Sequence, residues 1–358
     1  MNAQRIDDTA CIVDLPAELT DSDEGPLFEA CVPVIKGKPN YVLLDFTAVK
    51  RMNGLGASML VKLYIRCKRR GQRLLLCGVG EHYDAVLRLI GMEPITSVFR
   101  NRATATAFAG ITDKADEAPA KAPAQAIDAA NWAISAGPLE VPEMPPEAIN
   151  MNMQGRRCVG PVDGFGQLWQ KTYRLRVNKA SITPAAIIAA LKENFPGFQP
   201  DYNRFYPSPR GISPGEVVLI DSKTPGGTVS TGVMVLYADE WSFTFITPQG
   251  HPESGWVTFS ASKDGNTTVA QILGLARASD PVYEAAFRVI GSNMQIKIWR
   301  HVLTSLAKHL KVPAEITVEP RRVDSGMQWG QAGNVWYNAQ VRTLFGVPFR
   351  RLTARRNR

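Results

Sequence analysis

The chain has 358 residues, 45% of them hydrophobic and 21% charged, a length that suits two domains with cores of their own. Its formal net charge of +8 invites comparison with proteins that bind nucleic acid or membranes. No apolar run approaches the roughly 20 residues that a membrane span needs. The acidic N-terminus also lacks the apolar core of a secretory signal.

The cysteines and histidines do not form a recognisable site. The five cysteines are odd in number and lack a CxxC spacing, so we expect reduced thiols in a cytoplasmic protein and no disulfide framework. The four histidines are scattered along the chain. We therefore expect no metal and no cofactor.

Residues 111–155 differ in composition from the rest of the chain. They are rich in Ala, Pro and acidic residues, carry a net charge of −5 and lack a sustained apolar period. This pattern predicts a semi-extended linker between two domains. Within it, Trp132, Ile134 and Leu139 either dock on a neighbouring domain or are isolated apolar residues of a flexible segment.

The positive charge is concentrated at the C-terminus. Residues 1–110 have a net charge of +2 and residues 156–337 of +5, whereas residues 338–358 alone contribute +6, all from arginine. The charge is thus mainly a property of the tail, and we do not expect nucleic acid as the main partner.

Short strands and helices alternate over residues 1–110. The predicted strands are residues 10–15, 41–47, 73–79 and 97–101, and the predicted helices are residues 25–37, 54–71, 82–92 and 102–110. The apolar runs at 41–47 and 73–79 are typical of strands buried on both faces. Such alternation predicts an α/β domain with a mainly parallel sheet and covering helices.

This region resembles the STAS domain, the fold of bacterial anti-sigma-factor antagonists. The resemblance rests on the strand that ends in Asp45-Phe46-Thr47, the turn from Met52 to Gly56 that opens a helix, the helix stop at Gly71, and the helix end at Leu89-Ile90-Gly91-Met92. It implies a domain at residues 1–110 that docks a protein partner, either a sigma-factor regulator or a second copy of the chain.

The family's signature turn reads roughly Asp-Ser-Ser-Gly-Leu, and its second serine is phosphorylated. Here the turn reads Arg51-Met52-Asn53-Gly54-Leu55, so the resemblance places Asn53, which cannot be phosphorylated, at the acceptor position. Two interpretations are compatible. Asn53, Gly54, Leu55, Gly56 and Ser58 form a partner-docking surface that is always in its unphosphorylated form, or Asn53 only caps the helix. Ser58 itself is expected to be a packing or solvent serine.

The second half of the chain has a different order of elements. A strand at residues 167–177 and a helix at 183–195 precede five strand-like runs between residues 216 and 279, and a long helical pattern covers residues 281–312. This order resembles the START-like (SRPBCC) superfamily, over about residues 160–312, and a bacterial branch of it with a Gly-His-Pro-Glu-x-Gly turn. The resemblance implies an α+β helix-grip domain at residues 156–316, with a curved antiparallel sheet around the long C-terminal helix.

A helix-grip domain would enclose a cavity for an apolar small molecule. The candidate lining residues are Tyr173, Phe205, Tyr206, Met234, Tyr237, Phe243, Phe245 and Trp256. They either line such a cavity or form an ordinary core. His251 and Glu253 are a candidate acid–base pair, with a structural turn as the alternative. No other catalytic set stands out.

Residues 317–358 form the predicted tail. At helical spacing, Tyr337, Val341, Leu344 and Phe345 share a face, Trp336 lies beside it, and arginines follow. The residues proposed to contact a membrane or another anionic surface are Trp336, Phe345, Arg350, Arg351, Arg355 and Arg356. The alternatives are binding to nucleic-acid phosphates and a helix docked on the domain with a solvated basic end.

Taken together, the sequence predicts a non-enzymatic bacterial regulatory adaptor. Its STAS domain docks a protein partner, and its helix-grip domain binds an apolar small molecule or acts as a scaffold. The alternatives are a cyclase- or hydratase-like enzyme that uses His251 and Glu253, and a peripheral membrane protein that binds through its tail.

Overall fold

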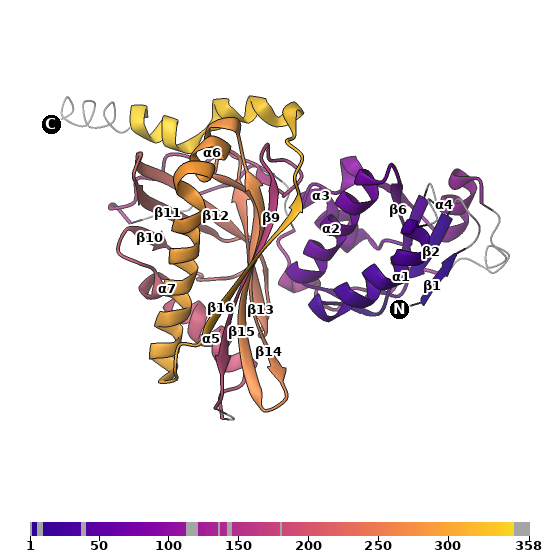
Figure 1. The fold of residues 1–358 in the computed structure, drawn as a ribbon, viewed down its shortest axis with the longest axis horizontal. Coiled ribbons are helices and arrows are strands. Elements are labelled where there is room, and N and C mark those ends of the chain that lie inside the picture. The colour runs from indigo at the N-terminus through magenta and orange to yellow at the C-terminus, as the bar shows by residue number, and fades with distance from the viewer. Residues whose placement is uncertain are drawn as a thin grey trace. The chain divides into compact units, whose positions relative to one another are not determined.

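The computed structural model describes residues 2–5, 10–36, 41–111, 121–134, 137–141, 145–179 and 181–346. The chain forms two compact units, Met1–Ile134 and Ser135–Arg358 (Figure 1). The segment predicted as a linker is divided between them, because its residues 121–134 belong to the first unit and residues 137–155 to the second.

The N-terminal unit is built on a mainly parallel sheet. Its strands are β1 (Asn2–Arg5), β2 (Ala10–Asp14), β4 (Tyr41–Asp45), β6 (Arg73–Cys77) and β7 (Ser97–Phe99), in the order β1-β2-β4-β6-β7. The β2–β4, β4–β6 and β6–β7 pairs are parallel, whereas β1 pairs with β2 in antiparallel fashion. The predicted parallel sheet is confirmed, and β1 is an edge strand that the sequence did not reveal. The short strands β3 (Glu18–Leu19) and β5 (Arg51–Met52) pair separately.

Helices cover both faces of this sheet. They are α1 (Glu24–Lys36), α2 (Gly54–Arg69), α3 (Glu81–Leu89) and α4 (Arg102–Ala109). Ile12, Leu43 and Leu75 lie side by side in the strand register and pack with Ala105 of α4. Since successive side chains of a strand point to opposite faces, Val42 and Leu44 point to the other face. There α1 contacts β2 and α2 contacts β6.

The C-terminal unit is built on an antiparallel sheet. Its strands are β8 (Cys158–Val159), β9 (Leu168–Val177), β10 (Asn203–Tyr206), β11 (Val217–Thr224), β12 (Gly227–Ala238), β13 (Ser242–Pro248), β14 (Glu253–Asp264), β15 (Thr267–Ala278) and β16 (Ile316–Asp324). The sheet order is β10-β11-β12-β13-β14-β15-β9-β16, and β8 pairs with β13. The five predicted central strands correspond to β11 to β15.

Helices pack against one face of the antiparallel sheet. The predicted helix at residues 281–312 is interrupted, because α6 (Pro281–Ala286) and α7 (Ser292–Leu310) are separated by a π-helical turn, Phe287–Gly291. Together with α5 (Pro184–Asn194), α7 encloses a core rich in aromatic rings. Its rings are those of Phe195, Phe243, Phe245, Phe259 and Trp299, each within 6 Å of a neighbour.

The predicted boundary at residue 316 is wrong, because the chain continues as part of the domain. Strand β16 pairs with β9 from Ile316 to Arg322 and, after a register shift, at Asp324. A 3-10 helix, Trp329–Tyr337, and a helix at residues 339–346 follow it. The side-chain amide of Asn338 donates to the carboxylate of Asp280 at 2.8 Å. The backbone N–H of Ala339 donates to the carbonyl of Gly250 at 2.9 Å. Within the described ranges, no helix is both long enough and apolar enough to cross a membrane.

Candidate functional site

The turn before α2 is capped by Asn53. Its backbone is extended, and its side-chain oxygen accepts hydrogen bonds from the N–H groups of Leu55 at 3.0 Å and Gly56 at 3.1 Å. These are N–H groups at the start of the helix that have no partner within the helix itself. The capping role of Asn53 is therefore realised in the structure.

Most of the predicted docking residues are inaccessible. Asn53 is half-buried, whereas Gly54, Leu55, Gly56 and Ser58 are buried. The hydroxyl of Ser58 donates to the carbonyl of Gly54 at 2.9 Å inside the helix, which makes it a packing serine. A side chain on Gly56 would lie 2.6 Å from the carbonyl oxygen of Leu19, so close backbone packing requires glycine there. The accessible part of the turn is Asn53 itself, with exposed Lys50 and half-buried Arg51.

A segment from the predicted linker lies on this turn. The carboxylate of Asp128 accepts hydrogen bonds from the N–H of Met52 at 3.0 Å and from the hydroxyl of Tyr83 at 2.7 Å. The indole N–H of Trp132 donates to the carbonyl of Met52 at 2.9 Å and contacts Asp128 at 3.2 Å. Trp132 is buried, whereas Ile134 is 78% exposed. Of the two alternatives for this segment, docking holds for Trp132.

The same segment is held by main-chain hydrogen bonds. The N–H of Ala124 donates to the carbonyl of Thr47 at 2.8 Å, and the N–H of Ile127 donates to the carbonyl of Lys50 at 2.9 Å. Residues 121–134 thus run along the loop between β4 and α2.

His82 lies close to the Asp128 anchor. Its ring meets that of Tyr83 edge-on at 5.0 Å, and its buried Nε2 has no hydrogen-bond partner among the residues that the structure describes. Burial lowers the pKa of His82, and the negative charge of Asp128 partly opposes this effect. The pKa of His82 is lowered overall, which favours a neutral imidazole ring.

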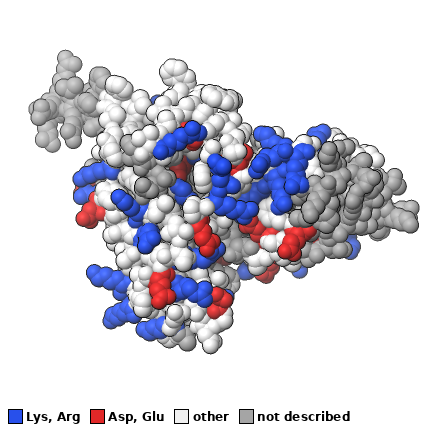
Figure 2. All heavy atoms as spheres, viewed as in Figure 1, with Lys and Arg blue, Asp and Glu red and all other residues white. Residues whose placement is uncertain are grey.

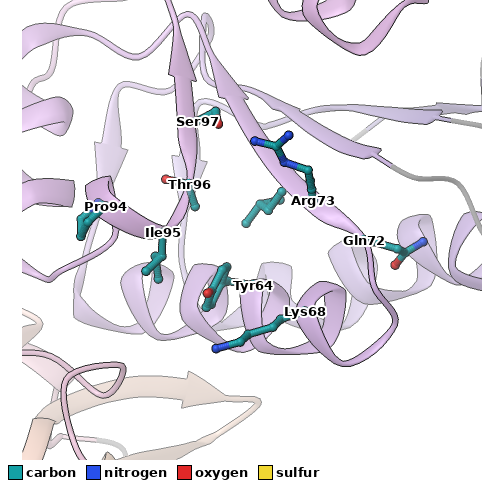
Figure 3. A pocket seen from close by; sticks show the side chains of 9 residues that line it. Tyr64, Lys68, Gln72, Arg73, Pro94, Ile95, Thr96 and Ser97 are labelled. Carbon is teal, nitrogen blue, oxygen red and sulfur yellow. The ribbon is translucent and has the colours of Figure 1, made fainter. Parts of the chain in front are cut away.

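A separate pocket of about 300 Å³ lies on the N-terminal unit beside the end of α2 (Figure 3). Its lining residues are Tyr64, Lys68, Gln72, Arg73, Leu74, Pro94, Ile95, Thr96 and Ser97. None of these was predicted as a site residue. Figure 2 shows Lys and Arg side chains gathered over α2, whose last turn contains Arg66, Lys68 and Arg69. Of the pocket's lining residues, Lys68 and Arg73 are cationic.

In the C-terminal unit, the eight predicted cavity residues lie on two faces of the sheet. Tyr173, Phe205, Phe243 and Phe245 belong to the core beneath α7. Tyr206, Met234, Tyr237 and Trp256 point to the opposite face. The strand register places them there, for Tyr237 through a bulge between Val235 and Tyr237. These eight side chains cannot therefore line one cavity.

His251 and Glu253 make separate contacts. Nδ1 of His251 lies 3.0 Å from both the backbone N and the backbone O of Glu253. Burial lowers the pKa of His251 to about 4, so the ring is neutral at neutral pH and Nδ1 accepts the Glu253 N–H. The Glu253 carboxylate instead accepts a hydrogen bond from Gln295 of α7 at 2.7 Å. Among the contacts of the described residues, none pairs the two side chains for acid–base chemistry.

Within the described part of the chain, two buried donors beneath α7 have no hydrogen-bond partner. They are the hydroxyl of Tyr173 on β9 and the indole N–H of Trp299 on α7. Burial raises the pKa of Tyr173, and the nearby charge of Glu253 raises it further. Lys171 contacts Gln295, which in turn contacts Glu253, and burial raises the pKa of Glu253. The polar side chains of Lys171, Gln295 and Glu253 thus lie at the border of the aromatic core.

The predicted surface residues of the tail are only partly described. Trp336 is 82% exposed and Phe345 is 69% exposed. Arg350, Arg351, Arg355 and Arg356 lie outside the described residues.

Comparison with known proteins identifies the N-terminal unit. The family model of the STAS domain matches residues 1–105. Residues 1–105 are a STAS domain. No curated protein matches the chain.

Solved structures show only distant similarity. An anti-sigma factor antagonist from Thermotoga maritima is 15% identical, with a TM-score of 0.28, covering 30% of this chain and 93% of its own. The unphosphorylated anti-sigma factor antagonist SpoIIAA is 13% identical, with a TM-score of 0.28, covering 31% and 98%. The di-domain ARO/CYC StfQ from the steffimycin biosynthetic pathway is 14% identical, with a TM-score of 0.32, covering 42% and 54%.

The sequence did not reveal that Asp128 contacts the turn before α2 and is also held by Tyr83. The one available signal was an Asp placed four residues before a Trp in a segment of small residues. The sequence also did not reveal the grouping of Lys171, Gln295 and Trp299, because that grouping depends on how α7 lies on the sheet.

Proposed function

We propose that this chain is a regulatory adaptor whose STAS domain docks a protein partner without a phosphorylation switch. One observation carries the proposal. The side chain of Asn53 caps α2 at the position where the family resemblance places the phosphorylated serine. A phosphate there would add a charge of about −1.5 to −2 at the helix N-terminus. An amide cannot accept it, so the turn keeps one charge state.

The charge near the turn indicates the kind of partner. Lys50 and Arg51 precede Asn53, and Arg51 stands where the family has Asp. A cationic edge favours an acidic partner surface, since complementary charge speeds association and excludes wrong partners. A sigma-factor regulator and a second copy of the chain are the candidates.

Affinity capture with the full chain tests this proposal. We expect the wild type to retain a defined protein, identified by quantitative mass spectrometry, and the Asn53→Asp variant to lose most of it. Asn101→Asp is the matched control, because Asn101 also caps a helix of the same domain, α4. Analytical ultracentrifugation reports self-association of the same three proteins. Equal capture by all three, or neither a captured partner nor a dimer, would refute the proposal.

We propose as a second function that the C-terminal unit binds an apolar small molecule beneath α7. The supporting observation is the pair of unpartnered donors on facing elements, Tyr173 and Trp299, beside a core of aromatic rings. A buried donor without an acceptor costs about 1–3 kcal/mol, so a ligand acceptor there would be well recognised. The expected ligand is an aromatic body carrying a carbonyl or ether oxygen.

Native mass spectrometry for a co-purified ligand and quenching of tryptophan fluorescence by flavone test the second function. Tyr173→Phe and Trp299→Phe remove the donors with little change of shape, and each should weaken flavone binding about threefold to tenfold. Tyr237→Phe is the control, since its hydroxyl bonds Asp239 on the other face of the sheet. Unsaturable quenching, with no co-purified molecule, would refute this function.

We do not propose catalysis by His251 and Glu253. The His251 ring is held by the backbone of Glu253, and the Glu253 carboxylate is held by Gln295. Among the described residues, the geometry of this pair therefore does not support the cyclase or hydratase alternative.

A further inference from the structure

Residues 121–134 are additional to the STAS fold. The family match ends at residue 105, and the last helix of the domain, α4, ends at Ala109. The five-stranded sheet formed by β1, β2, β4, β6 and β7 within the described residues includes no part of the later segment. The segment is thus placed on a domain that is already closed.

The segment is fixed by two anchors. Asp128 and Trp132 are both 1% exposed, whereas the other large apolar side chains of the segment, Ile127 and Ile134, are 61% and 78% exposed. A short 3-10 helix, Ala129–Asn131, lies between the anchors and brings both to Met52. A few buried anchors among exposed neighbours are typical of a docked peptide.

The contacts on the receiving surface are largely main-chain groups. The N–H and carbonyl of Met52 bind Asp128 and Trp132, and the carbonyls of Thr47 and Lys50 accept the segment's N–H groups. The Tyr83 hydroxyl adds a side-chain donor to the carboxylate. Main-chain pairing supplies affinity for an extended peptide, and side-chain pockets supply its specificity.

From this geometry we infer that the STAS domain carries a docking site for a peptide in which an extended stretch is followed by a turn with an acidic residue four positions before a tryptophan. Residues 121–134 are its resident occupant. A partner segment of the same chemistry must displace them, so occupancy by the chain's own segment controls access to the site. The inference does not depend on the partner of the proposed function, because its receptor and its ligand both belong to this chain.

A labelled synthetic peptide with the sequence of residues 121–134 tests the inference by fluorescence anisotropy with the full chain. The wild type, Trp132→Ala, Asp128→Asn and Ile134→Ala chains are compared. We expect Trp132→Ala to vacate the site and bind the peptide roughly thirtyfold more tightly than the wild type, as loss of a tryptophan anchor allows. Asp128→Asn should have an intermediate effect. Ile134→Ala should match the wild type, because Ile134 is exposed.

Hydrogen exchange on the same chains checks that the site opens while the domain stays folded. In Trp132→Ala the amides of Ala124 and Ile127 should exchange faster, while those of β4 and β6 stay protected. Equal peptide binding by Trp132→Ala and Ile134→Ala would overturn the inference. Loss of protection in β4 and β6 would also overturn it, since the segment would then be an integral part of the fold. A peptide with alanine in place of its tryptophan should not bind any of the chains.

Discussion

Trp132 and Met52 are joined by a hydrogen bond of 2.9 Å between the indole N–H and the main-chain carbonyl. The N–H of the same Met52 donates to Asp128. Both polar main-chain groups of the residue before the Asn53 cap are thus satisfied by a segment about 80 residues later in the chain. The start of α2 and the docked segment should therefore respond together to substitution.

Asp128→Ala should destabilise the N-terminal unit by about 3 kcal/mol, because it removes the buried carboxylate that accepts the Met52 N–H and the Tyr83 hydroxyl. Urea unfolding followed by circular dichroism measures the loss. Asp84→Ala is the control, since Asp84 pairs with Arg88 on the same surface helix and should cost under about 0.5 kcal/mol. A loss at Asp128 no greater than at Asp84 would contradict the anchoring role.

Asn53→Ala should cost about 1 kcal/mol, because the N–H groups of Leu55 and Gly56 lose their cap. Asn53→Ser should recover most of that loss, because a serine hydroxyl can cap the same groups. Thermal unfolding compares these variants with Asn101→Ala, whose side chain caps α4 through the N–H of Thr104 at 2.9 Å. If Asn53→Ala were neutral while Asn101→Ala was not, the capping account of this turn would fail.

The STAS domain was predictable because its elements carry strong local patterns. The apolar run at β4 and the amphipathic pattern of α2, ended at Gly71, are visible without any tertiary information. The docking of residues 121–134 was not predictable in the same way. It depends on main-chain groups of Met52, Thr47 and Lys50, and main-chain groups leave no pattern in the sequence.

Three features of the C-terminal unit could not be predicted from the sequence, and each has a physical reason. Strand β16 contains Pro320 and charged residues, which an edge strand tolerates because one side of its backbone is unpaired. The π-helical turn Phe287–Gly291 preserves a helical apolar pattern while it interrupts the α-helix. A bulge between Val235 and Tyr237 moves Tyr237 to the face opposite to Val235, against the simple alternation of side chains along a strand.

His251 should make the C-terminal unit less stable in mild acid. Its pKa falls to about 4 in the folded state from a usual value of 6.5, so the unfolded chain binds the proton more tightly. Stability is therefore full above about pH 6.5 and declines as the pH falls toward 4, by up to about 3 kcal/mol. Urea unfolding at about pH 7 and about pH 4.5 measures this dependence.

His251→Asn isolates this contribution, because an asparagine oxygen can accept the Glu253 N–H and does not titrate in this range. The raised pKa of Glu253 acts in the opposite direction, since the folded state then binds its proton more tightly, and it is common to both proteins. The variant should show a flatter decline than the wild type. Parallel profiles would show that His251 is not the responsible group.

Gly250→Ala should detach the segment that follows the 3-10 helix Trp329–Tyr337. Gly250 has a φ of +90°, and an added Cβ would lie 2.1 Å from the carbonyl oxygen of Tyr337. We expect a loss of about 3 kcal/mol or more from strain and overlap, together with faster proteolysis near Tyr337. Gly265→Ala is the control, because its φ is +59° but no atom lies within 4 Å of the added Cβ, so only about 1 kcal/mol is expected. Equal losses in the two variants would argue against the backbone contact at Tyr337.

We propose that the helix at residues 339–346 binds anionic membrane surfaces through its exposed face. Ala339 and Thr343 face the domain and are buried, whereas Val341, Leu344 and Phe345 are exposed. The sequence continues with arginines, each worth about 1 kcal/mol near an anionic bilayer.

Sedimentation with vesicles that contain phosphatidylserine tests this prediction. Binding should weaken with salt, and it should fall at least about tenfold in Leu344→Ser/Phe345→Ser and on truncation after Gly346. Truncation after Gly333 is less informative, because it also removes Asn338 and Ala339, which hold the segment on Asp280 and Gly250. Ile134→Ser is the control, since it removes an exposed apolar residue elsewhere in the chain. Binding to neutral vesicles as strong as to anionic ones would exclude the electrostatic contribution, and unchanged binding by the double variant would exclude this face.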